Sequence, residues 1–591
     1  MAITLPHRPR IAHGHRAGTV LDVEVHEDVE TRLPGRLASF GIFLVVALIY
    51  GYLGYRTTID SHVVVFDALD RLARSYMVWH NDPPKLAAVG FVFPPITTMA
   101  LLPFALVKPV ATSLVALPAS SAVFAAATVV MLDRTLARCE VMPLLRLPLM
   151  LAFAFNPFWL FYAGNGMSEA LYSFFLAFTL YSFVSWYTTT EPRYLIAAGF
   201  NLSILVLVRY AFIVWAILFA LLIGVALIRR AARRIEIEGS VIAFAAPIMY
   251  VLALWVLFNA LIVGDPFGWV SDTTTSAQAI NATGIDTASS LNLNDVATRL
   301  VELTVAVFPL AFIAVPALVA TFVMQRNDMA LWLASFIVLG IVIIGVHAYS
   351  ADKESLLTLR DSMPMYVASF VGAAWLFRSL PAMRLAIFAA AMALLLLNWF
   401  TAWQGMKNYP FQSQEQAYTR ALFSGDDQEG KSSRGGYTAG IASEARMADY
   451  INKRIPQKKN SILTDNAQTF GVILLSGRPQ NFFDRVDKGD SKFRKVLAKP
   501  NGVVDYMLYA TNRRSGDIIR QLYPRAADNA EAGLTLVFRT PRYALVRVAK
   551  TAPQAVATTT TTKKTTTGSG GTSTTTTTGR ARTIIPSGTT P

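Results

Sequence analysis

Long apolar blocks alternate with short polar segments over the first 405 residues of the chain. Blocks such as 37–55, 241–263 and 331–346 contain no Asp, Glu, Lys or Arg. They approach or exceed the ~20 residues that a helix needs to cross a bilayer. A buried helix of a soluble protein would show a polar stripe with a period of 3.6 residues, and these blocks lack one. The pattern therefore predicts membrane-spanning helices.

Arginine clusters between the blocks predict the orientation of the chain. Short loops rich in Lys and Arg stay in the cytoplasm, and placing every cluster there gives about eleven spans. The N-terminus is then cytoplasmic, and the C-terminal part lies outside. The clusters are Arg32/Arg36, Arg134/Arg138/Arg146, Arg193, Arg229/Arg230/Arg233/Arg234, Arg326 and Arg378/Arg384. The predicted spans are 38–55, 111–132, 147–163, 168–187, 194–209, 210–228, 240–263, 300–323, 329–349, 363–379 and 385–403.

The apolar segment 87–107 does not fit this count, because a full span there would move the Arg134 cluster to the outer side. It contains the pair Pro94–Pro95. Proline removes a backbone donor and breaks a simple helix. We predict a re-entrant or interfacial segment, and an ordinary kinked span is the alternative.

Composition divides the chain into a series of regions. We predict a cytoplasmic N-terminal segment, a transmembrane domain, a linker, an extracytoplasmic α/β domain and a disordered Thr-rich tail. Their ranges are 1–36, 37–405, 406–443, 444–550 and 551–591. Within the α/β domain the expected helices are 444–455, 467–475 and 516–523, and the expected strands are 461–465, 504–511, 534–539 and 542–548.

Charge and cysteine content narrow the functional classes. The chain is 53% hydrophobic and 15% charged, with a net charge of +15. Much of the basic excess flanks the spans or lies in the tail, so membrane orientation explains it without nucleic acid. The single cysteine, Cys139, excludes an intrachain disulfide or a thiolate metal cluster. The α/β domain has no GxGxxG or P-loop motif, so nucleotide binding is not indicated.

A carboxylate opens the first outer loop. Asp60 follows the first span, and apolar residues at helical spacing over 61–77 predict an amphipathic helix lying in the interface. Asp67, Asp70 and Arg71 lie on its polar face. Asp60 is a candidate general base for a hydroxyl nucleophile. The alternative is that Asp60 only caps the helix.

Further charged residues fall on the same side of the membrane. Glu169 follows a turn, 164–168, at the entry of the next helix, where an acid also suits the helix dipole. Arg209 and Arg360 lie near hydrocarbon, which is costly, and a guanidinium suits a phosphate. Alternatively, Arg209 pairs with Glu169 structurally, or Arg360 snorkels to the headgroups.

This arrangement resembles the GT-C superfamily of membrane glycosyltransferases over about residues 30–405. The resemblance is to its mannosyl- and aminoarabinosyl-transferase branches. It depends on Asp60 after the first span, the loop 57–110, the turn that precedes Glu169, and the two outer arginines. The loop contains Phe93–Pro94–Pro95, and the turn runs from Asn156–Pro157 to Gly166-Met167-Ser168-Glu169.

The resemblance implies transfer of a mannose- or arabinose-like sugar from a polyprenyl-phosphate donor to a glycan, lipid or protein acceptor at the outer face. Asp60 would be the base, and Arg209 and Arg360 would hold the donor phosphate. Asp67, Glu169 and His62 are expected to contact substrate. Many members carry paired acids where this chain has Asp60-Ser61-His62, and a single acid suits a mechanism without a metal. A divalent metal between Asp60 and Asp67 remains an alternative.

Two other functions stay open. A transporter or flippase would need many spans and buried polar groups, but it usually shows an internal repeat, which we do not find in this sequence. A non-catalytic envelope-assembly protein would bind a partner through its outer domain and would not need Asp60 or Arg360. The sequence alone does not identify the sugar, the acceptor or the role of the C-terminal domain.

Overall fold

A computed structural model describes residues 33–84, 86–90, 94–262, 264–267, 269, 292–350, 357–410, 413–432, 438–512 and 516–551. The predicted Thr-rich tail beyond 551, most of the predicted N-terminal segment and Phe93 lie outside the described residues. Helices dominate the first two thirds of the chain. They are α1 (Arg36–Tyr55), α2 (Phe66–His80), α3 (Ile96–Ala105), α4 (Lys108–Thr112), α5 (Ala116–Arg138), α6 (Pro143–Ala154), α7 (Pro157–Tyr162), α8 (Ser168–Thr189), α9 (Pro192–Val208), α10 (Phe212–Arg229), α11 (Arg234–Ile262), α13 (Leu293–Val307), α14 (Ala311–Gln325), α15 (Asp328–Ser350), α16 (Met363–Ser379), α17 (Arg384–Asn408) and α18 (Ser413–Ser424).

The predicted polytopic helical membrane architecture is confirmed. In the described part of the chain, seven helices are long and apolar enough to cross a membrane. The pair α13 and α14, bent by 97°, makes an eighth if it forms one span. This count is lower than about eleven because several predicted spans are short or broken in the structure. Most of residues 147–163 lie in α6 and α7, which Phe155 and Asn156 separate, and α9 and α16 have 17 residues each.

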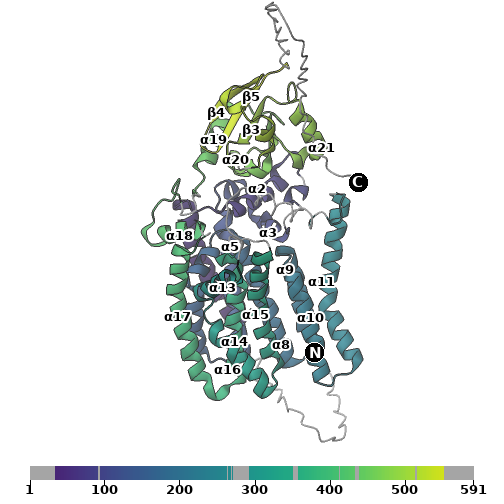
Figure 1. The fold of residues 1–591 in the computed structure, drawn as a ribbon, viewed down its shortest axis with the longest axis vertical. Helices are drawn as coiled ribbons and strands as arrows, with labels where there is room; N and C mark the ends of the chain where they lie inside the picture. Colours follow the sequence, from purple (N-terminus) through teal and green to yellow (C-terminus); the bar gives the residue numbers. More distant parts are fainter. Residues whose placement is uncertain are drawn as a thin grey trace, which may run out of the picture. The chain divides into compact units, whose positions relative to one another are not determined.

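The predicted cytoplasmic arginines meet at one end of the helix bundle. Arg378 and Arg384 each place a guanidinium nitrogen 2.9 Å from the Glu140 carboxylate. Arg138 donates to the hydroxyl of Tyr194 at 2.9 Å. The loops after α5, α8 and α16 therefore lie on the same side of the bundle, as the charge pattern predicted. The α/β domain lies at the other end (Figure 1).

The described part of segment 87–107 is too short to span. It forms a 3-10 turn, Leu86–Val89, and the ten-residue helix α3. Ten residues of helix extend about 15 Å, half of a bilayer core. This length is consistent with the predicted re-entrant or interfacial segment and not with a kinked span.

The first outer helix differs from its prediction. α2 begins at Phe66, not at residue 61, and its N-cap Val65 provides no side-chain hydrogen bond. Asp60 ends a separate π-helical turn, Arg56–Asp60, so the interpretation of Asp60 as the cap of α2 is wrong. The apolar face of α2, with Leu69, Leu72 and Tyr76, is fully buried in protein. It packs against α3 and the C-terminal domain instead of resting on lipid.

The C-terminal domain contains a five-stranded sheet with the order β2-β1-β3-β5-β4. β1 pairs in parallel with β2 and β3, whereas β5 is antiparallel to β3 and β4. The strands are β1 (Ile462–Thr464), β2 (Phe482–Phe483), β3 (Tyr506–Ala510), β4 (Leu534–Arg539) and β5 (Tyr543–Val548), and the helices are α19 (Ala442–Arg454), α20 (Asn466–Ser476), α21 (Arg485–Ala498) and α22 (Ile518–Leu522). The predicted small α/β domain is thus confirmed.

Sequence reasoning missed three elements in this part of the chain. β2 has two residues, too few to show an alternating pattern. α21 and α18 are polar helices, and α18 lies inside residues 406–443, which we predicted as a linker. Helix α2 lies between the bundle and the α/β domain (Figure 1).

Candidate active site

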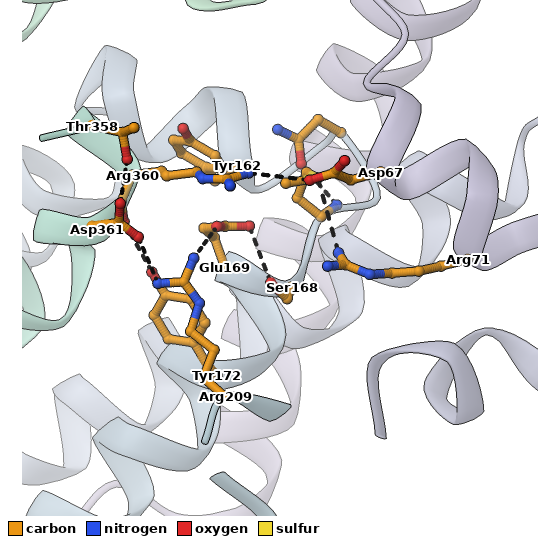
Figure 2. Close-up of polar contacts among 12 residues, drawn as sticks. Asp67, Arg71, Tyr162, Ser168, Glu169, Tyr172, Arg209, Thr358, Arg360 and Asp361 are labelled. Carbon is orange, nitrogen blue, oxygen red and sulfur yellow. Dashed lines mark hydrogen bonds and ion pairs between the residues drawn. The ribbon is translucent and has the colours of Figure 1, made fainter. Parts of the chain in front are cut away.

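Arginines and carboxylates from four parts of the chain meet at the end of the bundle that faces the C-terminal domain (Figure 2). Helix α2, the start of α8, the end of α9 and the 3-10 turn Leu359–Ser362 each contribute. We call this group the charged cluster; its members are Asp67, Arg71, Glu169, Arg209, Arg360 and Asp361.

Arg209 is held between two carboxylates. Its Nη2 lies 3.1 Å from Glu169 Oε1, and its Nη1 lies 3.0 Å from Asp361 Oδ1. The Glu169 side chain has no exposed surface, and the guanidinium carbon of Arg209 lies 5.0 Å from the centre of the Tyr172 ring. The predicted pair of Arg209 with Glu169 is therefore present. Because Asp361 also accepts a hydrogen bond from Thr358, the position of this guanidinium is fixed from several sides.

Arg360 forms the more exposed ion pair of the cluster. Its Nη1 lies 3.2 Å from Asp67 Oδ2, and the side chains are 39% and 54% exposed. The backbone carbonyl of Arg360 accepts a hydrogen bond from the Tyr172 hydroxyl at 3.2 Å. This pair presents both a cation and an anion to a ligand, which the fully buried Glu169 does not.

The charge of Asp67 is stabilised by its neighbours. Loss of surrounding water acts to raise the pKa of Asp67, but Arg360 and Arg71 lower it below the ordinary value. Asp67 is therefore ionised at neutral pH. A lowered pKa also makes a carboxylate a weaker proton acceptor. Any ligand that draws Arg360 away from Asp67 would make Asp67 more basic.

Arg71 belongs to the cluster, although the sequence placed it only on the polar face of a helix. It lies one turn after Asp67 on α2, at the spacing that brings two side chains together. Burial lowers the pKa of Arg71, while the charges of Asp67 and Glu169 raise it. The spacing of four residues was a signal for its proximity to Asp67. Its proximity to Glu169 had no signal in the sequence.

A second buried acid lies close to the cluster. The Tyr162 hydroxyl donates to Glu415 Oε1 at 2.5 Å, and Glu415 comes from α18 in the predicted linker. Burial raises the pKa of Glu415, and the charges of Arg360 and Glu169 act on it as well. Figure 2 shows Tyr162 beside Arg360. Sequence reasoning did not predict Glu415, because a linker acid gives no signal of burial.

Asp60 and His62 make their polar contacts elsewhere. Asp60 Oδ2 lies 3.5 Å from Nε of Arg56, within the same π-helical turn, and its side chain is 40% exposed. His62 Nδ1 lies 2.9 Å from Asp427 Oδ1, on the segment that follows α18. Among the described residues, neither is hydrogen-bonded or ion-paired with the charged cluster. The structure thus brings together Asp67, Glu169, Arg209 and Arg360 from the predicted set.

Metal ligands do not gather in the described part of the chain. Within it, no group of three or more His, Cys, Asp or Glu residues is placed to hold a metal ion. Asp60 pairs with Arg56 and Asp67 pairs with Arg360, so each of the two acids considered for a metal already faces a guanidinium.

Comparison with known proteins identifies the fold. The structure matches the crystal structure of ArnT from Cupriavidus metallidurans bound to undecaprenyl phosphate, with a TM-score of 0.53. The match covers 87% of this chain and 98% of ArnT, at 12% sequence identity. The chain has a GT-C fold. This confirms the resemblance that the sequence indicated, and at this identity the likeness concerns the fold.

Two structures of an oligosaccharyltransferase from Archaeoglobus fulgidus are also similar to this chain, each with a TM-score below 0.5. One is AglB in complex with an inhibitory peptide and a dolichol-phosphate, at a TM-score of 0.45 and 10% identity over 85% of this chain and 74% of that one. The other, in complex with Zn and sulfate, has a TM-score of 0.44 and 10% identity over 83% and 71%. No family model and no curated protein sequence matches the chain.

Proposed function

We propose that this protein is a membrane glycosyltransferase that moves a sugar from a polyprenyl-phosphate donor to an acceptor on the outer side of the membrane. The observation that carries the proposal is the charged cluster at one end of a GT-C fold, with Arg360 and Asp67 exposed to a ligand. A guanidinium binds phosphate strongly, and a carboxylate is a proton acceptor. These are the two groups that glycosyl transfer from a lipid phosphate requires.

The donor phosphate binds the arginines of the cluster. Arg360 contacts it directly, because its side chain is 39% exposed and its protein partner is an exposed acid. Arg209 stabilises the phosphate charge electrostatically without contacting it, because Glu169 and Asp361 already pair with both of its terminal nitrogens. As the sugar leaves, negative charge grows on the phosphate, and fixed positive charge at that position lowers the barrier. The lipid tail lies among the spans, so no nucleotide site is needed.

Asp60 is the general base of this proposal. Its place after the first span supports the assignment, and its side chain is 40% exposed. In this mechanism Asp60 takes the proton of an acceptor hydroxyl, the hydroxyl oxygen bonds to the anomeric carbon, and the polyprenyl phosphate leaves with the bonding electrons. His62 and Asp67 contribute substrate contacts, and the buried Glu169, which was expected to contact substrate, acts instead by holding Arg209 in place.

A specific observation favours Asp67 as a second candidate for the base. Asp67 pairs directly with Arg360, and the charge of Arg360 helps to keep the pKa of Asp67 low. If Arg360 pairs with a donor phosphate instead, the pKa of Asp67 rises. Donor binding would then activate the base at the moment when it is needed. Asp60 has no such link to the donor arginines among the described residues.

Transfer of radiolabelled sugar by the purified full-length protein in nanodiscs tests the proposal. Mannosyl and arabinosyl polyprenyl-phosphate donors are offered with a membrane lipid and glycan extract as acceptor. Asp60→Asn and Asp67→Asn are compared with Asp70→Asn, which changes an acid on the same helix that pairs with Arg74. A positioned base is worth about 10²–10⁴-fold in rate. Only the variant that lacks the base should lose that much, and an inactive wild type would contradict the proposal.

The sugar is mannose- or arabinose-like, and the acceptor is a glycan, lipid or protein of the cell envelope. The assay identifies both, because each donor is offered separately and the labelled product is characterised. We propose that the N-terminus is cytoplasmic and the α/β domain extracytoplasmic, since the arginine-rich loops lie at the end of the bundle opposite that domain.

A further inference from the structure

Helix α2 has two faces with different partners. Asp67 and Arg71 point from one face into the charged cluster (Figure 2). The other face packs along α20 of the C-terminal domain. Its last turn, with Met77 and Val78, lies in one apolar core with Met447 and Ile451 of α19. A helix that follows the first span in sequence is therefore built into the core of a domain more than 370 residues later.

Two contacts of α2 with the C-terminal domain lie directly beside the acid of the cluster. The guanidinium carbon of Arg542, at the start of the β5 hairpin strand, lies 4.7 Å from the centre of the Phe66 ring. The ring of Phe470 on α20 meets the same ring edge-on at 6.3 Å. Phe66 immediately precedes Asp67, so these two contacts fix the first turn of α2.

Arg542 is itself held rigidly. Its Nη1 lies 3.0 Å from Oε1 of Glu444, whose side chain has no exposed surface. The Tyr543 hydroxyl donates to the same Glu444 oxygen at 3.0 Å, and Arg542 Nη2 donates to the Thr438 hydroxyl at 2.7 Å. A guanidinium with this many partners keeps its position over the aromatic ring.

The rest of α2 is fitted to α20 with little space. A Cβ added at Gly471 would lie 3.2 Å from Leu69 Cδ2 and 2.9 Å from Glu444 Cγ, so the two helices approach closely only because residue 471 is glycine. At the other end of the contact, the Tyr76 hydroxyl donates to the Gly477 carbonyl at 3.2 Å.

We infer that the C-terminal domain positions Asp67 and Arg71, with Arg542 and Phe66 as the positioning residues, so that the domain forms part of the active site. This inference rests on the proposed function for its catalytic consequence. The domain holds the helix that carries two members of the charged cluster, and it acts through that helix without touching the donor. Removing the Arg542 contact should therefore loosen α2 and misplace both side chains together.

The experiment combines hydrogen exchange with kinetics on the full-length protein in nanodiscs. Arg542→Gln and Phe66→Leu are compared with Arg539→Gln, which changes an exposed arginine on the edge strand β4. Peptides that cover residues 66–80 report on α2, and peptides of α5 serve as the reference. All assays are run well below the thermal midpoint of each variant, so that a general loss of fold is excluded.

We expect faster exchange in α2 but not in α5 for Arg542→Gln and Phe66→Leu, and no change for Arg539→Gln. Turnover should fall by about tenfold to a hundredfold, because a small misplacement of groups that position the substrate has an effect of this size. The KM for the donor should change less than kcat, and Arg542→Lys should recover part of the rate.

Unchanged exchange in α2 would overturn the inference, as would a loosened α2 with normal turnover. The exchange measurement does not depend on activity. If exchange in α2 becomes faster in Arg542→Gln and Phe66→Leu but the wild-type protein transfers no sugar, the positioning of α2 by the domain is supported and the proposed function fails.

Discussion

Arg360 Nη1 lies 3.2 Å from Asp67 Oδ2, and 293 residues separate the two side chains in the chain. The pair joins the turn before α16 to the first outer helix. A salt bridge that is half exposed contributes at most about 1 kcal/mol to stability. In the proposed function, its value lies in placing a cation where the donor phosphate binds, beside an acid that is the second candidate for the base.

Arg360→Ala should weaken binding of the donor. A hydrogen bond to a charged group is worth about 1.5–3 kcal/mol, which corresponds to a rise of roughly 10- to 150-fold in the donor KM. The donor KM of Arg360→Lys should lie between those of Arg360→Ala and the wild type, because lysine keeps the positive charge but cannot form the two parallel hydrogen bonds of a guanidinium. Arg539→Ala is the matched control. An unchanged donor KM in Arg360→Ala would contradict the role of Arg360.

Glu169→Gln should destabilise the protein through Arg209. Glu169 has no exposed surface, and its loss leaves a guanidinium with one carboxylate partner at the end of α9. We expect a loss of about 1–3 kcal/mol, because a largely buried guanidinium then loses one of its two charged partners. Glu302→Gln breaks an exposed pair with Arg299 within one helix and should change stability by less than about 0.5 kcal/mol. Thermal melting in nanodiscs measures both variants against the wild type. If Glu169→Gln lowered the midpoint no more than Glu302→Gln, the prediction would be contradicted.

The pairing of Asp67 should give an acid-sensitive stability. Its pKa in the folded protein is below the ordinary value of 3.8, so its contribution is present above that pH and is lost as the pH falls through the lower folded value. Asp67→Asn lacks this contribution at every pH. The thermal midpoints of the wild type and the variant should therefore differ at pH 6 and converge below the ordinary pKa. A difference that stays constant down to the lowest pH would exclude this account.

Asp517 in the C-terminal domain should give the opposite dependence. Burial raises the pKa of Asp517 from 3.8 to about 7. The folded domain then holds a proton that the unfolded chain releases, so stability falls as the pH rises between these two values. Asp517→Asn keeps an acceptor for the backbone N–H of Ile519 and removes the titration. Hydrogen exchange of β3 should slow from pH 7 to pH 5 relative to the variant, after correction for the intrinsic rate. The same dependence in both proteins would refute the assignment.

The orientation can be tested with reporters fused after residue 410. We expect a reporter that is active only outside the cytoplasm to work at this site, because the arginine-rich loops lie at the opposite end of the bundle. A fusion in the loop after α10, near Arg230, serves as the control and should show cytoplasmic activity. Cytoplasmic activity at both sites would place the α/β domain inside.

The apolar blocks determined the helices, because crossing a bilayer requires a run of apolar residues that is local in sequence. The same reasoning found most strands of the C-terminal domain, since alternation is also local. It did not predict the break at Asn156 that divides residues 147–163 between α6 and α7, and it misplaced the start of α2 because helix ends depend on a few residues. Polar helices such as α18 have no apolar signal, so Glu415 could not be predicted as a buried acid.

Individual residues of the candidate site could be found from the sequence by their type and their position relative to the spans. A charged side chain such as Arg209 or Arg360 has a high free-energy cost near hydrocarbon, and Glu169 lies at the start of a helix. Only the tertiary structure decided how they combine. Arg209 pairs with both Glu169 and Asp361, and Arg360 pairs with Asp67. The structure also shows that Asp60 pairs with Arg56 outside the charged cluster and that Arg71 belongs to the cluster. A charge pattern says which groups need partners, whereas the packing of helices distant in sequence decides which partner lies within 4 Å.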